Sequence, residues 1–85
     1  MSTLHLLFSS TGATTALPRL QAGDAVVLIQ DGCYATAALP QDSTYVVSID
    51  GQARGMLDRL NHYASIDYAE LVQLTEAHEL VVSWR

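Results

Sequence analysis

Residues 24–30, which read DAVVLIQ, decide the fold. Four consecutive apolar residues with branched side chains stand at the centre of this stretch, and a strand of that composition is typically buried on both of its faces. Burial on both faces is characteristic of a parallel sheet that is covered by helices on each side. The stretch therefore predicts an α/β fold with a mainly parallel sheet.

Four other short apolar stretches are also expected to be strands. They are residues 4–8, 44–50, 63–66 and 80–84. Helical patterns alternate with these stretches, as they do in α/β proteins. With 85 residues, the chain is expected to form one domain, residues 1–85, with about five strands flanked by helices.

The first helical pattern contains a proline. Residues 11–22 are mostly helical in character, but Pro18 cannot occupy a regular helix interior. We therefore expect a helix that starts late, near Thr14 or Thr15, or one that is kinked. Residues 35–39 are expected to form at most a turn or two.

The third helical pattern follows Asp50, which we expect to cap it. Its apolar residues recur at the i, i+3, i+4, i+7 spacing of one helix face. They are Ala53, Met56, Leu57 and Leu60.

The fourth helical pattern has the strongest start signal. Asp67 can accept hydrogen bonds from the first turn, and Glu70 stands at the reciprocal position of a capping box. Ile66 and Leu71 are spaced as a hydrophobic staple. One face of the expected helix is lined by Tyr68, Leu71, Val72 and Thr75.

The charge balance argues against a nucleic-acid-binding protein. The net charge is −5, and the four cations are Arg19, Arg54, Arg59 and Arg85, without any lysine. A phosphate-binding surface needs clustered cations, so we expect no direct nucleic-acid contact. There is no basic, long apolar start typical of a signal peptide and no apolar run of membrane-spanning length, so we expect a cytoplasmic protein that does not enter a membrane.

The apolar content points to protein partners. The chain is 49% hydrophobic and 15% charged, which leaves more apolar surface than so small a domain can bury alone. Tyr63, Tyr68 and Trp84 are amphipathic residues of the kind enriched in interfaces. Covering a small core is an equally good interpretation of these three side chains.

Cys33 is the only cysteine, and two interpretations of it are open. It follows a predicted strand, at the edge of the sheet where α/β proteins place reactive groups, and a helix start there would favour the thiolate. However, no cation is near it in sequence, and Asp31 would oppose ionisation. Since free cysteine is also a common small core residue, we favour a structural role.

Other recognised site patterns do not occur in the sequence. His5, His62 and His78 do not combine with other ligands at a metal-binding spacing, so no metal or cofactor is expected. Residues 9–15, SSTGATT, could cradle an anion but lack the glycine and lysine pattern of a phosphate-binding loop. We interpret that segment as a turn and helix cap.

Four separated motifs resemble the TusB/DsrH family. They are LIQDGCYA at residues 28–35, ARGML at 53–57, IDYAELVQLTEAH at 66–78 and SW at 83–84. Their order and spacing match the family across nearly the whole chain. The resemblance implies a small α/β fold of the DsrE type.

The resemblance also implies a function. TusB-like members join TusC-like and TusD-like chains in a dimer of heterotrimers that relays persulfide sulfur toward 2-thiolation of the wobble uridine in certain tRNAs. The TusD-like subunit carries the acting cysteine and passes sulfur to a TusE-like partner. DsrH-like members serve sulfur oxidation and typically carry a cysteine within the first helix.

This sequence departs from the DsrH-like pattern because residues 14–20 contain no cysteine. Cys33 occupies a position where the family usually has an ordinary apolar residue. We therefore expect a non-catalytic subunit whose interface candidates are Met56, Tyr68 and Trp84. The alternatives are a DsrH-like role in sulfur oxidation and a persulfide carrier that uses Cys33.

Overall fold

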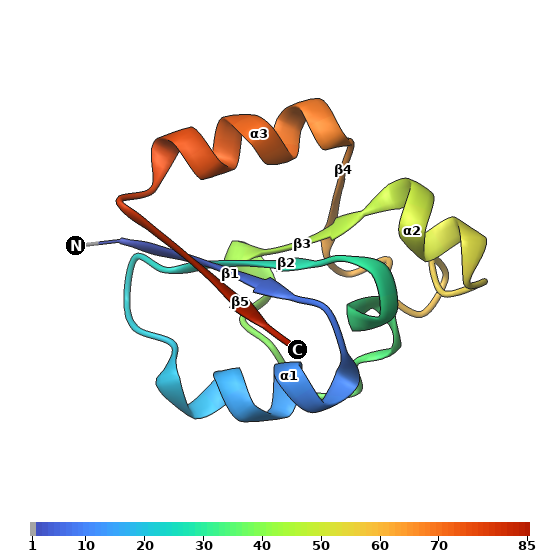
Figure 1. Ribbon diagram of the computed structural model, residues 1–85. Helices are drawn as coiled ribbons and strands as arrows, with labels where there is room; N and C mark the ends of the chain where they lie inside the picture. The colour runs from blue at the N-terminus through green and yellow to red at the C-terminus, as the bar shows by residue number, and fades with distance from the viewer. Residues whose placement is uncertain (1) are drawn as a thin grey trace.

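A single parallel sheet forms the centre of the computed structural model, which describes residues 2–85 (Figure 1). Its five strands lie in the order β4-β3-β2-β1-β5, and every neighbouring pair is parallel. The strands are β1 (Thr3–Leu7), β2 (Ala25–Leu28), β3 (Thr44–Val47), β4 (Ala64–Ile66) and β5 (Leu80–Trp84). The predicted α/β fold with a parallel sheet is confirmed.

Helices cover both faces of this sheet. Figure 1 shows α1 (Ser10–Ala16) against one face and α3 (Tyr68–Ala77) against the other. All four residues of β2 are buried, as its composition predicted. Its side chains divide between two core clusters, with Val26 and Leu28 on the α1 side and Ala25 and Val27 on the α3 side.

The first helix differs from the expected late start. It begins at Ser10, because the Ser9 side chain accepts a hydrogen bond of 2.9 Å from the backbone N–H of Gly12. The α-helix ends at Ala16, and a 3-10 helix, Leu17–Arg19, follows with Pro18 in its first turn. Proline therefore shortens the helix at its end, where the missing N–H cannot continue the α-helical pattern.

The third helix is much shorter than predicted. The observed helix α2 (Ser48–Ala53) begins two residues before Asp50, which lies in its first turn and is not its cap. Gly55 has a φ of +65°, in the left-handed region that ends helices. Met56, Leu57 and Leu60 consequently lie in the turns after α2. No helix forms at residues 35–39 either, since the local 3-10 helices are Gln30–Tyr34 and Gln41–Ser43.

The start of α3 is as predicted. Asp67 accepts from the Glu70 backbone N–H at 2.7 Å, and the Glu70 side chain accepts from the Asp67 N–H at 3.0 Å. Ile66 and Leu71 both join the core cluster on the α3 side, in agreement with the hydrophobic staple.

Only part of the α3 face recognised in the sequence packs against the sheet. Leu71 is buried and Leu74 packs beside it, whereas Tyr68 is 47% and Val72 54% exposed. Leu71 and Leu74, three residues apart, lie on one line along the helix, and both pack in the core cluster on this side of the sheet. Tyr68 and Val72 lie on the adjacent row.

Candidate functional site

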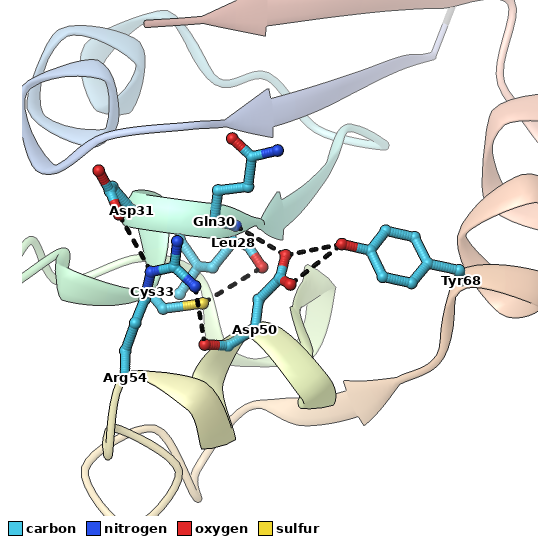
Figure 2. Close-up of polar contacts among 7 residues, drawn as sticks. All are labelled: Leu28, Gln30, Asp31, Cys33, Asp50, Arg54 and Tyr68. Atoms are coloured by element: carbon cyan, nitrogen blue, oxygen red, sulfur yellow. Dashed lines mark hydrogen bonds and ion pairs between the residues drawn. The ribbon is translucent and has the colours of Figure 1, made fainter.

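Polar side chains from three segments meet beyond the carboxyl ends of β2, β3 and β4 (Figure 2). We call Asp31, Asp50, Arg54 and Tyr68 the outer cluster, because each forms a polar contact with another member or its backbone. Cys33 lies in the same region. Ligands of open α/β sheets gather at this edge, so the cluster is the first place to look for chemistry.

Cys33 is sealed inside the protein. It is the fourth residue of the five-residue 3-10 helix Gln30–Tyr34, not the start of a helix, and its side chain is 0% exposed. Its Sγ lies 3.8 Å from the carbonyl oxygen of Leu28, to which the thiol donates (Figure 2). Burial, together with the negative charge of Asp50, raises the pKa of the Cys33 thiol to about 11.

Gly32 explains how the segment around Cys33 packs so closely. A Cβ at this position would lie 1.8 Å from the carbonyl oxygen of Leu7, so that only glycine fits. The 3-10 helix consequently rests directly on the end of β1. Glycine is therefore needed here for the close approach of two backbones.

The Asp50 carboxylate joins three segments of the chain. It accepts from the backbone N–H of Gln30 at 2.9 Å and from the Tyr68 hydroxyl at 2.9 and 3.0 Å. Gln30 has a φ of +50°, an uncommon value for a residue with a side chain, and the bond to Asp50 holds it there. Burial and this hydrogen bond to Asp50 raise the pKa of Tyr68.

Arg54 closes the outer cluster on the other side. Figure 2 shows its guanidinium between Asp31, whose Oδ1 accepts from Nε at 3.0 Å, and the Asp50 carbonyl oxygen, which accepts from Nη1 at 3.2 Å. The hydrogen bond to Asp31 raises the pKa of Arg54. Because the charged groups are engaged with one another, the arrangement fixes the loops above Cys33.

A second polar group, which we call the inner cluster, consists of His5, Asp24 and Trp84. Trp84 Nε1 donates to His5 Nδ1 at 3.0 Å, and His5 Nε2 lies 2.9 Å from Asp24 Oδ2. Since an indole N–H can only donate, Nδ1 is the acceptor and Nε2 carries the hydrogen given to Asp24. The side chains of His5 and Asp24 are buried.

Asp24 also holds two backbone groups. Its carboxylate accepts from the N–H of Thr3 and from the N–H of Gln21, each at 3.1 Å. Burial alone would raise the pKa of Asp24, but the hydrogen bonds from His5, Gln21 and Thr3 outweigh it and lower the pKa. The inner cluster thereby ties β1, β2 and β5 together.

Comparison with known proteins places the chain in a family. A model of the family described as "DsrH like protein" matches residues 8–81. The chain belongs to the DsrH-like family. The family resemblance expected from the four sequence motifs is therefore confirmed.

Relatives named "Protein TusB" support the same assignment. The protein of that name from Pectobacterium parmentieri is 38% identical over 94 aligned positions, covering 95% of this chain and 99% of the relative. The one from Escherichia coli O81 (strain ED1a) is 32% identical, and 99% of each chain is covered. A third, from Pectobacterium carotovorum, is 39% identical over 82% of this chain and 84% of the relative.

The DsrH-like chain does not bring its three predicted interface residues together. Met56 and Trp84 are partly buried and pack against the core cluster on the α1 side. Tyr68 lies on α3, across the sheet, with its hydroxyl bound to Asp50. The three residues therefore lie apart in the structure, and each stays an interface candidate.

The other residues considered as possible ligands in the sequence analysis contact neighbours close to them in the chain. His78 Nδ1 lies 2.7 Å from the carbonyl oxygen of Leu74 at the end of α3, and His62 packs against the ring of Tyr63. The segment at residues 9–15 is the cap and body of α1. Within residues 2–85, no three acidic, histidine or cysteine side chains are grouped as metal ligands would be, and no helix is long and apolar enough to cross a membrane.

Sequence reasoning missed both polar clusters. Asp50 was interpreted as a helix cap, and His5 as a histidine without metal-binding partners. A usable signal existed for the outer cluster, because Asp31, Asp50 and Tyr68 each follow a different parallel strand and must meet at one edge of the sheet. The bond between His5 and Trp84 spans 79 residues of sequence and had no local signal.

Proposed function

We propose that this chain is a non-catalytic subunit of a TusBCD-type sulfur-relay complex that supports 2-thiolation of the tRNA wobble uridine in the cytoplasm. Its role is to orient TusC-like and TusD-like subunits in a dimer of heterotrimers. The TusD-like subunit passes sulfur on to a TusE-like protein. Membership in the DsrH-like family and relatives named "Protein TusB" that match nearly the whole chain support this proposal.

The state of Cys33 is the observation that carries the non-catalytic role. A persulfide carrier needs a thiolate that a sulfur donor can reach. Cys33 is inaccessible, and its pKa of about 11 keeps it protonated at neutral pH. These properties argue against the alternative in which Cys33 carries the persulfide.

The first helix bears on the second alternative, a DsrH-like role in sulfur oxidation. The resemblance associates that role with a cysteine within the first helix. Here the sequence of α1 is STGATTA and that of the following 3-10 helix is LPR, so neither contains a cysteine. This favours the tRNA-thiolation route.

Exposed apolar side chains support a role in assembly. Within residues 2–85, six large ones are at least 40% exposed: Tyr34, Ile49, Tyr68, Val72, Leu80 and Val81. In a chain of 85 residues, this much uncovered apolar surface is typical of a subunit that meets partners. We include Tyr68, Met56 and Trp84 among the residues that contact those partners.

Co-expression with TusC-like and TusD-like chains tests the proposal. Native mass spectrometry of the purified material is expected to show one complex with equal copies of all three chains. A chain that associates with neither partner, whatever its own oligomeric state, would contradict the proposal.

The Cys33→Ala variant tests the non-catalytic role. Alanine fits the apolar pocket, so the variant is expected to enter the complex and to support sulfur transfer from a cysteine desulfurase at the wild-type rate. The matched control is the loss of the acting cysteine in the TusD-like subunit, which should stop transfer. A mass gain of one sulfur on the wild-type chain, absent in Cys33→Ala, would instead establish the persulfide carrier.

A further inference from the structure

The outer edge of β5 is an open edge of the sheet. β5 pairs with β1 on one side and has no neighbour on the other within residues 2–85. The Leu80 N–H donates to the Ser2 carbonyl, and the Trp84 carbonyl accepts from the Phe8 N–H, so both residues direct their backbone groups toward β1. Because these directions alternate along a strand, Val81 and Ser83 present their N–H and C=O groups outward.

This edge lacks the usual protection against pairing. Soluble proteins guard exposed edges with short strands, proline, or charged residues within the strand. The opposite edge strand, β4, has only three residues. Strand β5 has five residues, whose sequence is LVVSW, and it contains no charged residue and no proline. Leu80 is 49% and Val81 40% exposed.

The charges that flank β5 indicate what pairs with it. Glu79 immediately precedes the strand and Arg85 immediately follows it, and both are exposed. In an antiparallel pair of two identical strands centred on Val82, Glu79 of each copy stands opposite Arg85 of the other. A shift of the centre to Val81 or Ser83 loses both of these opposite-charge pairs.

We propose that β5 binds the β5 strand of a second copy of this chain in antiparallel orientation, about a two-fold axis at Val82. In this register the outward groups of Val81 meet those of Ser83, which is the hydrogen-bonded type of antiparallel pair. Leu80 of one copy stands opposite Trp84 of the other, an aliphatic and aromatic pair on the α1 face. The contact is isologous and closes as a dimer of two five-stranded sheets.

Two features of the single chain are compatible with this pairing. The indole of Trp84 is anchored by its bond to His5, so it meets Leu80 of the second copy in a fixed position. The Arg85 guanidinium lies 4.7 Å from the centroid of the Phe8 ring, on the same face as the expected Glu79 contact. This inference concerns contact between two copies and does not depend on the proposed sulfur-relay function.

Charge exchange is the sharpest test of the proposal. Sedimentation velocity over a concentration series is expected to show a dimer for the full chain. Glu79→Arg and Arg85→Glu each place like charges opposite one another twice per dimer and should weaken it by about tenfold. The double variant E79R/R85E restores opposite charges and should dimerise like the wild type, and an equimolar mixture of the two single variants should form a heterodimer.

Ser83→Pro tests the backbone contact. The N–H of Ser83 points away from β1. Proline at this position therefore removes an outward donor and leaves the pairing of β5 with β1 intact. The variant is expected to be monomeric with a wild-type circular dichroism spectrum. If it fails to fold, the surface charge variants still decide the matter.

Two outcomes would overturn the inference. One is a monomeric wild-type chain, and the other is a dimer that responds to neither charge exchange nor proline. Capture by TusC-like and TusD-like chains is measured on the same samples. A monomer that is captured overturns the β5 contact alone, whereas a β5-dependent dimer that is not captured overturns the proposed function alone.

Discussion

The inner and outer clusters use similar polar groups in opposite surroundings. In the inner cluster, the buried side chains of His5 and Asp24 are linked to Trp84, and the hydrogen-bond roles of all three are fixed. In the outer cluster, Asp31 and Tyr68 are exposed, and water can replace each contact that is broken. Because an unsatisfied group costs far more when it is buried, we expect the inner cluster to contribute to stability and the outer cluster to set local geometry.

Asp24→Ala is expected to have the largest effect. It leaves the part-buried donors of His5 and Thr3 without an acceptor and should lower the free energy of unfolding by about 2–3 kcal/mol, measured by urea denaturation. Asp42→Ala is the matched control, because Asp42 is exposed in a short 3-10 helix and its replacement should change stability by less than about 0.5 kcal/mol. Equal effects of the two variants would contradict the distinction between the clusters.

Acid should remove the contribution of Asp24. Its pKa is lower in the folded protein than the ordinary 3.8, so the ionised carboxylate stabilises the fold. This stabilisation is complete above the pKa that Asp24 has in the unfolded chain. It is lost as the pH falls through the lower pKa that Asp24 has in the folded protein. The stability difference between wild type and Asp24→Ala should therefore narrow as the pH falls below about 4. A difference that persists unchanged in stronger acid would show that the charge of Asp24 is unimportant.

The sequence could predict those elements that depend on residues close together in the chain. The capping box of α3 and the buried strand β2 are such elements, and both were predicted correctly. The length of α2 was not, because the apolar spacing up to Leu60 suggested a longer helix. A left-handed Gly55 ends that pattern, and the core then takes up Met56 and Leu60 from turns.

The polar clusters could not be predicted in the same way because they depend on strand order. Strand β5 lies beside β1, and this neighbourhood alone brings Trp84 to His5. The outer cluster similarly needs the ends of β2, β3 and β4 to be adjacent. Alternating strands and helices predict the class of fold, but they leave the order of strands open.

Asp50→Ala should have an intermediate effect. The variant removes the acceptor for the Gln30 N–H and the Tyr68 hydroxyl, at a partly solvated site, and is expected to cost about 1 kcal/mol in urea denaturation. Gln30 then loses the contact that holds its φ of +50°, so the segment before Cys33 loosens. Faster reaction of the Cys33 thiol with a disulfide reagent should report that change. A rate equal to that of the wild type would show that the outer cluster does not protect the thiol.

Tyr68→Phe should have the smallest effect and isolates one contact of the outer cluster. The ring stays on the first turn of α3 and only the hydroxyl that donates to Asp50 is lost, so we expect about 0.5 kcal/mol. In a double-mutant cycle, Tyr68→Phe should cost almost nothing once Asp50 is alanine, because the acceptor is already gone. Additive effects would mean that the hydroxyl stabilises the fold without Asp50. A loss of binding to TusC-like or TusD-like chains in Tyr68→Phe, with stability nearly unchanged, would assign this exposed residue to the subunit interface.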